Sequence, residues 1–335
     1  MKIIVTGAAG FIGSAFVRIM LGGGNEHRVV VLDKLTYAGN LENLAPVAEK
    51  PGYSFVRGDI CEAALVNELI QTEQPDAIVH FAAESHVDRS ILSPEPAFET
   101  NLRGTFTLLE AVRTHKVPRY VHVSTDEVYG SLDEPLEADE NFPLRPSSPY
   151  SASKAGSDLL ALSYFTTFRC PVLVTRASNN YGPYHFPEKL IPLMISNALE
   201  DKPLPIYGDG MQVRDWLYVE DHCRGILSVL EGGREGEIYN IGGNCSLPNR
   251  EVVERILRLT GKPESLMVRV TDRPGHDRRY ALSSEKLMRE TGWSPQMPFD
   301  RGLELTINWY RENQRWVQRV KSGAYQDFYQ LNYTR

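Results

Sequence analysis

A chain of 335 residues is long enough to bury a full hydrophobic core and indicates one large domain or two closely joined ones. Its net charge of −7, without a stripe of clustered Lys and Arg, argues against a nucleic acid as partner. The first apolar segment is too short for a signal peptide and no apolar run approaches the ~18 residues of a membrane span, so we expect a cytoplasmic protein without membrane contact.

The first half of the chain alternates predicted strands and helices. Apolar runs rich in Val and Ile predict strands at 2–7, 28–33, 53–60, 76–83, 119–125 and 171–177. The spacing of apolar residues predicts helices at 11–21, 61–73, 97–115 and 153–168. This alternation predicts a Rossmann-type α/β fold, a doubly wound parallel sheet with helices on both faces.

After about Ala177 the sequence changes character. Pro and Gly become frequent at 179–192, 201–210 and 272–279, whereas 213–230 and 237–243 still resemble elements of the sheet domain. We therefore predict a first domain at 1–177, to which 213–243 also belongs. A smaller, interleaved C-terminal domain is expected at 178–212 and 244–335.

The cysteine pattern narrows the possible classes. Cys61, Cys170, Cys223 and Cys245 are scattered, with no Cys-x-x-Cys spacing. Such a pattern is typical of reduced thiols in a cytosolic protein. We therefore expect no disulfide framework and no metal site.

A glycine-rich turn follows the first predicted strand. Gly7, Gly10 and Gly13 stand in Gly-x-x-Gly-x-x-Gly spacing before a helix, so backbone N–H groups can approach a pyrophosphate at the helix N-terminus. Asp33 ends the second strand 20 residues later, where its carboxylate would accept a hydrogen bond from the adenosine ribose and repel a 2′-phosphate. The pattern predicts NAD rather than NADP as cofactor. The predicted cofactor site also includes Phe11, Ile12, Asp59, Ile60, Phe81, Ala82, Ala83 and Ser85.

Tyr150 and Lys154 are predicted one turn apart on a helix that Ser148 caps and Pro149 begins. Tyr-x-x-x-Lys alone is common by chance, but here it follows a dinucleotide loop and a strand that ends in Thr125. For a tyrosine of pKa ~10 to act as a base near neutrality, the phenolate needs ~4 kcal/mol of preferential stabilisation. The ammonium of Lys154 and a positive nicotinamide can supply it, while Thr125 would hold the reacting hydroxyl.

With these residues the chain resembles the extended short-chain dehydrogenase/reductase family over essentially its whole length. Family members that act on nucleotide sugars share the glycine loop, the Tyr-x-x-x-Lys and the "NNYGP" found here at 179–183. The resemblance implies that Tyr150 and Lys154 also contact the cofactor and that Asn180 faces it. It extends the expected cofactor site to Lys34, Thr36, Gly39 and Thr100.

Two carboxylates, Asp126 and Glu127, directly follow Thr125 at the strand end. Epimerases of the family carry small neutral residues there, because moving a hydride out and back needs no extra acid or base. Dehydration needs both: beside a 4-ketone, Glu127 can remove the C5 proton while a neutral Asp126 protonates the leaving C6 hydroxyl. Adjacent acids suit this division, since one ionised partner raises the pKa of the other. The alternative is that both acids are solvated or pair with arginines.

Five motifs together are similar to those of the family's 4,6-dehydratases that act on dTDP-glucose: "STDEVYG", "AAESHVDRS", "SPYSASKAGSD", "NNYGPYHFPEKLIP" and "DRPGHDRRY". The resemblance implies an NAD-dependent lyase that oxidises C4, eliminates water across C5 and C6, and returns the hydride to C6. The product would be dTDP-4-keto-6-deoxyglucose, with NAD tightly bound and recycled in each turnover. It assigns Tyr150 as the C4 base, Asp126 as the acid and Glu127 as the C5 base.

The substrate's pyrophosphate requires cations, and the second domain offers Lys189, Arg214 and Arg273. Two roles stay open for His86, which either orients a carboxylate or is an ordinary satisfied polar residue. The resemblance places the remaining contacts in the same motifs. The predicted substrate site comprises Ser85, His86, Thr125, Asn179, Lys189, Leu190, Pro205, Ile206, Tyr207, Arg214, Asn249, Arg273 and His276.

Rival functions remain. The same dehydration of UDP- or CDP-glucose is poorly discriminated by sequence, because the choice of base depends on a few pocket contacts. An epimerase or decarboxylase acting on a UDP-sugar is opposed by Asp126 and Glu127. A non-enzymatic NAD-binding scaffold is opposed by the intact Thr125, Tyr150 and Lys154, which binding alone would not require.

The predicted helices around 99–115 and 153–168 carry apolar residues beyond one core face. These are Phe106, Leu109, Leu160 and Tyr164. Members of the family pair such helices about a two-fold axis. The resemblance therefore implies a homodimer through a four-helix bundle.

Overall fold

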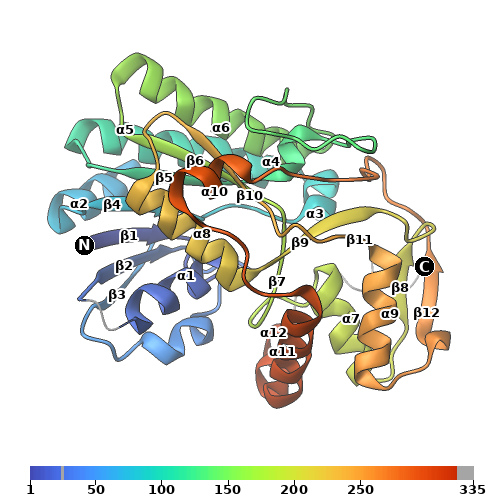
Figure 1. Ribbon diagram of the computed structural model, residues 1–335. Helices are drawn as coiled ribbons and strands as arrows, with labels where there is room; N and C mark the ends of the chain where they lie inside the picture. The colour runs from blue at the N-terminus through green and yellow to red at the C-terminus, as the bar shows by residue number, and fades with distance from the viewer. Residues whose placement is uncertain (24–25, 323–335) are drawn as a thin grey trace.

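A large parallel sheet forms the centre of the protein, whose computed structural model describes residues 1–23 and 26–322 (Figure 1). Its seven strands run in the order β10-β6-β5-β4-β1-β2-β3. They are β1 (Lys2–Thr6), β2 (Arg28–Asp33), β3 (Tyr53–Arg57), β4 (Ala77–His80), β5 (Tyr120–Thr125), β6 (Val172–Ala177) and β10 (Ile238–Ile241). Every neighbouring pair is parallel. The predicted Rossmann-type α/β fold is thus confirmed.

Helices cover both faces of this sheet because successive strand residues point to opposite sides. In β1, Ile3 and Val5 pack in the cluster that includes α1 and α8, whereas Ile4 packs against the opposite layer. The first layer contains α1 (Phe11–Gly22), the 3-10 helix η1 (Leu41–Val47) and α8 (Val219–Gly232). The opposite layer contains α2 (Ala63–Glu73), α5 (Thr105–His115) and α6 (Pro149–Phe168). Helices α3 (Val87–Leu92) and α4 (Glu95–Phe98) contact α6.

The helix predicted at 97–115 is interrupted in the structure. A π-helical turn, η2 (Glu99–Gly104), separates α4 from α5. Within it, the Asn101 amide accepts from the backbone N–H of Glu84 (2.9 Å) and donates to the Glu84 carbonyl (3.1 Å) and to Ser153 Oγ (2.8 Å). These contacts cross between distant segments, so the local apolar spacing did not reveal the interruption.

The second half of the chain builds a smaller unit from two short sheets. One has the order β11-β9-β7 and the other pairs β12 with β8. Their strands are β7 (Asn179–Tyr181), β8 (Leu204–Tyr207), β9 (Val213–Tyr218), β11 (Ser246–Pro248) and β12 (Met267–Val270). They pack with α7 (Leu190–Leu199), α9 (Asn249–Thr260), α11 (Phe299–Glu312) and α12 (Gln314–Val320) around a separate apolar core.

The chain crosses between the two units more than once. Strand β9 is hydrogen-bonded to β7 and β11, whereas α8 and β10, which follow it, return to the large sheet. Helix α10 (Glu285–Thr291) also lies against α8, and the 3-10 helix η4 (Glu264–Leu266) precedes β12. The predicted domain boundaries stay a prediction, and residues 323–335 of the predicted second domain lie outside the described residues.

Helices α5 and α6 pack side by side and expose part of their apolar surface. Leu109 and Tyr164, expected to face a partner, are instead buried in the chain's own core. That expectation was wrong because helical spacing does not tell a core face from a second apolar face. Phe106, Leu159 and Phe168 are the large apolar residues exposed on these helices, at 48%, 58% and 50%.

No helix within residues 1–23 and 26–322 has the length and apolar character needed to span a bilayer. A cavity of ≈ 420 Å³ opens at the carboxyl ends of the large-sheet strands, facing the smaller unit. The strand order reverses between β1 and β4, and such switch points are where open α/β sheets bind ligands.

Candidate active site

The cavity brings together all residues that the sequence analysis assigned to a site. From the large sheet and its loops come Gly7, Gly10, Phe11, Ile12, Gly13, Asp33, Lys34, Thr36, Gly39, Asp59, Ile60, Phe81, Ala82, Ala83, Ser85, His86, Thr100, Thr125, Asp126, Glu127, Tyr150 and Lys154. From the smaller unit and its connections come Asn179, Asn180, Lys189, Leu190, Pro205, Ile206, Tyr207, Arg214, Asn249, Arg273 and His276. Segments up to ~270 positions apart in the sequence thus share one cavity, although lining it does not by itself establish a role.

The glycine loop lies directly against the end of β4. Gly7 has a φ of +69°, and a Cβ there would lie 2.5 Å from the Cα of Ala82. A Cβ on Gly13 would lie 2.7 Å from the Gly7 carbonyl oxygen, so both positions require glycine. No side chain caps α1 at Gly10, and its first turn carries no acidic residue. The N–H groups at this helix end therefore suit an anion such as the pyrophosphate of a dinucleotide.

Asp33 ends β2 beside this loop. Its carboxylate accepts hydrogen bonds from the backbone N–H groups of Ala9 (2.9 Å) and Leu35 (2.8 Å). Burial raises the pKa of Asp33, and the two N–H donors act against that rise. Next to it, Lys34 Nζ lies 2.5 Å from Asp59 Oδ2. The ribose end of the cavity therefore presents acidic oxygens, which fits a free 2′-hydroxyl and not a 2′-phosphate.

The Asp33→Asn variant should lower the preference for NAD over NADP by roughly tenfold or more, because it removes the charge that repels a 2′-phosphate. Calorimetric titration of the cofactor-free protein would give the two dissociation constants. Asp76→Asn is the matched control. Asp76 directly precedes β4, at the amino ends of the strands and away from the cavity, and accepts a hydrogen bond from the Lys2 N–H. An unchanged ratio in Asp33→Asn would contradict this role.

Tyr150 and Lys154 project from the first turns of α6. The predicted cap is confirmed: Ser148 accepts from the N–H of Ser151 in a capping box, and Pro149 begins the helix. Burial raises the pKa of Tyr150, the charge of Glu127 raises it further, and a hydrogen bond with Thr125 lowers it. Lys154 is 3% exposed and donates to the Val123 carbonyl (2.9 Å).

Burial also acts on Lys154 and lowers its pKa to about 8. The two groups are therefore held in a largely dry site, where a charge on one strongly affects the other. A cationic Lys154 and a hydrogen bond from Thr125 both favour the phenolate form of Tyr150. The arrangement can supply a tyrosine base once burial is offset by nearby positive charge.

Asp126 and Glu127 begin a short 3-10 helix, η3 (Asp126–Tyr129), that Thr125 caps by accepting from the Glu127 N–H (3.3 Å). Asp126 is 3% exposed, and its Oδ2 has no hydrogen-bond partner among the described residues. Burial raises its pKa well above the ordinary value, and the negative charge of Glu127 raises it further. Asp126 is accordingly suited to be a neutral acid.

Glu127 sits in a different environment. Burial raises its pKa, but the positive charges of Arg273, Lys189 and Arg214 lower it. Arg214 also lowers the pKa of Asp126, but Arg273 and Lys189 act on Glu127 alone of the two acids. Glu127 thus has more positive charge around it than Asp126 has. This is the division that a base and an acid require at one pH.

Three cations converge on the cavity from the smaller unit. Lys189 Nζ donates to the Ser85 carbonyl (2.7 Å), and Arg214 donates to the carbonyls of Val213 (2.8 Å) and Asp277 (2.9 Å). Within residues 1–23 and 26–322, neither Lys189 nor Arg214 forms an ion pair. Arg273 does, since its Nη1 lies 2.5 Å from Asp88 Oδ1. The cavity therefore carries positive charge available to an anionic ligand.

His86 and His276 each face a carboxylate. His86 Nε2 lies 3.6 Å from Glu188 Oε2, and burial lowers the pKa of His86 well below its ordinary value. His276 Nδ1 lies 2.6 Å from Asp272 Oδ1, with its pKa lowered to about 4, mainly by burial. Both rings are thus held in place and neutral near pH 7. The two roles predicted for His86 both stay predictions.

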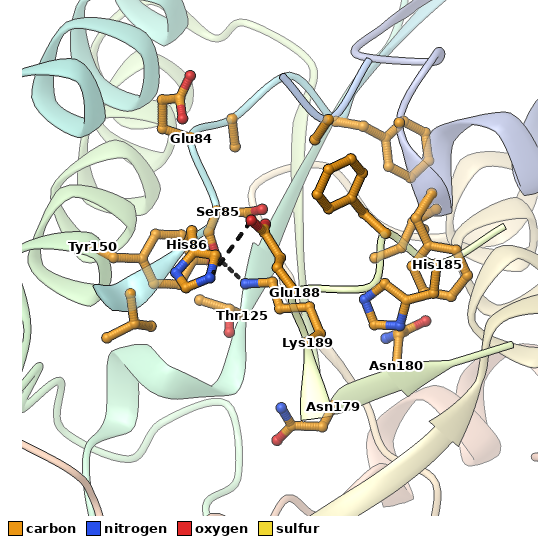
Figure 2. Close-up of a pocket in the computed structure, with 18 of the residues that line it drawn as sticks. Glu84, Ser85, His86, Thr125, Tyr150, Asn179, Asn180, His185, Glu188 and Lys189 are labelled. Carbon is orange, nitrogen blue, oxygen red and sulfur yellow. Dashed lines mark hydrogen bonds and ion pairs between the residues drawn. The ribbon is translucent and has the colours of Figure 1, made fainter. Parts of the chain in front are cut away.

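Some lining residues were missed by the sequence reasoning. Glu188 points with Lys189 toward His86 and Ser85 (Figure 2), and burial raises its pKa to about 7. It immediately precedes Lys189 in "PEKLIP", so its motif was a usable signal. His185, from the same motif, stacks on Phe11 of the glycine loop with ring centroids 4.0 Å apart.

Nothing in the sequence around Trp316 predicted that this residue would line the cavity. Its Nε1 donates to Asn43 Oδ1 (3.0 Å), and the Asn43 amide donates to the Ala9 carbonyl in the glycine loop (2.9 Å). Helix α12 thereby contacts the cofactor end of the cavity from 273 positions away in the sequence. Only the folded arrangement shows this contact.

Proteins of known activity are similar to this chain in sequence and in fold. The sequence profile described as GDP-mannose 4,6 dehydratase matches residues 4–306. A dTDP-glucose 4,6-dehydratase of Shigella flexneri is 52% identical in an alignment 358 positions long, which covers 99% of each chain. Crystal structures of dTDP-glucose 4,6-dehydratases from Bacillus anthracis, in complex with NAD, and Streptomyces venezuelae, with NAD bound, match with TM-scores of 0.91 and 0.93. Their sequences are 50% and 53% identical, and each comparison covers 96% of this chain and 100% of the other. A fold and a sequence shared over almost the full length place the chain in the GDP-mannose 4,6 dehydratase family, among the dTDP-glucose 4,6-dehydratases.

Proposed function

We propose that this chain is an NAD-dependent lyase that converts dTDP-glucose to dTDP-4-keto-6-deoxyglucose. The observation that carries the proposal is the pair of adjacent acids at the end of β5, one with an unpartnered buried oxygen and the other faced by cations. The likeness to dTDP-glucose 4,6-dehydratases over 99% of the chain supports the substrate. It also favours dTDP-glucose over the UDP- and CDP-glucose alternatives.

The cofactor is NAD, which when bound accepts a hydride from the sugar and returns it within each turnover. The residues that would hold it are the glycine loop, Asp33 and the lining of the cavity up to Lys154. At the reacting end, Tyr150 takes the proton of the C4 hydroxyl. Lys154 stabilises the phenolate by its charge, and Thr125 holds the hydroxyl by a hydrogen bond.

Elimination follows at the 4-ketone stage. The ketone acidifies the C5 hydrogen, and Glu127 removes that proton. Asp126 donates its proton to the C6 hydroxyl, which then leaves as water. Glu127 then returns a proton to C5. Tyr150 releases to solvent the proton of the C4 hydroxyl and Asp126 regains one from solvent, so the sum is the loss of one water without net oxidation.

The substrate is anchored by its charged half. Lys189, Arg214 and Arg273 provide positive charge for the pyrophosphate, and Tyr207 in β8 lies where it can cradle the base. Asn179, Asn249 and His276 are proposed as further polar contacts. This anchoring fixes the sugar relative to Tyr150 and the two acids.

The function is tested by incubating the protein with dTDP-, UDP- and CDP-glucose side by side in the presence of NAD. We expect a 4-keto-6-deoxy sugar nucleotide from dTDP-glucose, formed fastest of the three, with NAD required only in catalytic amount. Mass spectrometry should show the loss of one water from the substrate. Stoichiometric accumulation of NADH would instead indicate an ordinary dehydrogenase.

We further propose a homodimer through α5 and α6, in which the helices of two chains form a four-helix bundle. Phe106 and Leu159 supply exposed apolar surface for it. Light scattering at micromolar concentration should give twice the mass of one chain for the parent protein. The double variant Phe106→Glu/Leu159→Glu should give the mass of one chain. Leu259→Glu, at an exposed site on α9, is the matched control and should stay dimeric. A monomeric parent protein would contradict the proposal.

A cytoplasmic location is proposed as well. All four cysteines are free thiols, with Cys170 and Cys223 buried. Reduced cysteines are typical of proteins in a reducing compartment, where NAD is also available.

A further inference from the structure

A cluster of buried charges lies behind Lys154, outside the cavity. Asp158, Arg176 and His122 are 0%, 2% and 0% exposed and come from α6, β6 and β5. None of the three lines the cavity, so none can touch a bound ligand there. The catalytic scheme above leaves this cluster without a role.

The cluster is joined to Lys154 by helix geometry. Asp158 follows Lys154 by four positions and therefore lies on the same face of α6. Arg176 Nε donates to Asp158 Oδ2 (2.8 Å), and His122 Nε2 lies 3.4 Å from Asp158 Oδ1. Arg176 is fixed further by its bond to the hydroxyl of Tyr129 (2.9 Å). The buried carboxylate of Asp158 thus lies between a buried guanidinium and a buried imidazole.

Stability alone is a poor reason for such a cluster. Removing charges from water costs free energy that their mutual attraction barely repays, and a well-packed apolar pair often serves a core as well. The position of the pair, one helical turn from the lysine beside Tyr150, suggests a different reason. We propose that Asp158 and Arg176 are positioning residues whose opposite charges set the charge state of Lys154 and, by acting directly on the tyrosine as well, the readiness of Tyr150 to become a phenolate.

All elements around Lys154 contribute groups to its surroundings. Tyr150 and Asp158 share α6 with it, His122 lies on β5, His80 on β4 and Arg176 on β6, while Asp126 and Glu127 come from η3. Burial lowers the pKa of His122 to about 4 and that of His80 further below its ordinary value, so both rings are neutral near pH 7. The fixed charges directly behind Lys154 are therefore those of Asp158 and Arg176.

The two charges act in opposite directions. Burial raises the pKa of Asp158, but Arg176 and the neighbouring groups outweigh it and hold the pKa at about 2, so the carboxylate stays ionised. Its charge supports the ammonium of Lys154 against burial and also raises the pKa of Tyr150 by disfavouring the phenolate. Arg176 opposes that support by occupying the same carboxylate. Removing the anion should lower the pKa of Lys154 and Tyr150, and removing the cation should raise both.

The inference rests on the proposed role of Tyr150, and its test needs no sugar substrate. The ionisation of Tyr150 is followed in the NAD-bound protein by ultraviolet difference absorbance, with Tyr150→Phe in each background as the blank. Asp158→Asn should move the midpoint down by roughly one pH unit, and Arg176→Met should move it up by about as much. The double variant should return close to the parent. The pH profile of turnover should shift in the same directions.

Arg255→Met is the matched control, because Arg255 pairs with Glu251 and Asp300 on the smaller unit and should leave the midpoint unchanged. Thermal unfolding establishes that each variant is folded. The double variant removes both members of the Asp158–Arg176 pair together, so it should fold even where a single variant does not. If the single variants fail, Asp158→Glu displaces the charge without removing it and should move the midpoint.

Equal midpoints in folded variants, or shifts of the two single variants in the same direction, would overturn the proposal. If the pair were purely structural, its loss would lower the unfolding temperature and leave the midpoint of Tyr150 ionisation unchanged. A shifted midpoint without any dehydratase activity would uphold the coupling and contradict the proposed function. The two claims can therefore fail separately.

Discussion

In the Asp126→Asn variant, loss of water from C6 should slow by ~10²-fold or more, which corresponds to about 2.7 kcal/mol of transition-state stabilisation. Asp126 is buried and its pKa is raised by burial and by the charge of Glu127, so it stands in the site as a neutral acid. An amide of almost the same shape replaces it without a change of charge. Only the transferable proton is lost.

The step before elimination should survive this change. Tyr150 and Lys154 remain in place, so C4 oxidation proceeds and reduced nicotinamide should accumulate in a single turnover, visible by its absorbance. Glu127→Gln is the informative comparison. This variant removes the C5 base and keeps the acid. Exchange of the C5 hydrogen with solvent deuterium should therefore stop in Glu127→Gln and persist in Asp126→Asn. Overall rates within a few-fold of the parent in both variants would remove the two acids from the elimination step.

The Tyr150→Phe variant should lose the first chemical step, with C4 oxidation slowed by ~10²–10⁴-fold. The phenylalanine ring fills the same space but cannot take the proton of the C4 hydroxyl. No reduced nicotinamide should form in a single turnover, in contrast to Asp126→Asn. Stopped-flow absorbance after mixing with dTDP-glucose separates the two patterns.

Tyr164→Phe is the matched control for that experiment. Tyr164 lies on the same helix, is 5% exposed, and donates its hydroxyl to Glu110 (2.6 Å) far from the cavity. It should retain the parent rate of C4 oxidation. Rapid formation of reduced nicotinamide in Tyr150→Phe would contradict the assignment of this tyrosine as the C4 base.

Features that depend on neighbouring residues could be predicted from the sequence. Tyr150 and Lys154 are four positions apart, and Ser148 and Pro149 show where their helix begins. The glycine loop and the Val-rich strands likewise carry their own signals, so the parallel sheet and the cofactor end of the cavity followed from local patterns. Asp126 and Glu127 could be located because they directly follow a recognisable strand.

Features that depend on the folded environment could not be predicted. The sequence shows two adjacent acids, but Lys189 and Arg273, the cations that act on Glu127 and not on Asp126, come from the separate unit. The contact of Trp316 with Asn43 joins the last described helix to the glycine loop, and the turn at Asn101 depends on its bonds to Glu84. Burial and long-range charge decide the protonation state of these groups, and the local sequence pattern predicts neither of them.

The proposed reaction requires that a single hydride leaves C4 and returns to C6 of the same sugar, with elimination by the two acids in between. dTDP-glucose labelled with deuterium at C4 tests it most directly, with the product examined by NMR and mass spectrometry. We predict that the deuterium appears in the C6 methyl group, that C5 carries a hydrogen from solvent, and that NAD is unchanged at the end. Deuterium retained at C4, lost to solvent, or left on stoichiometric reduced cofactor would contradict the account.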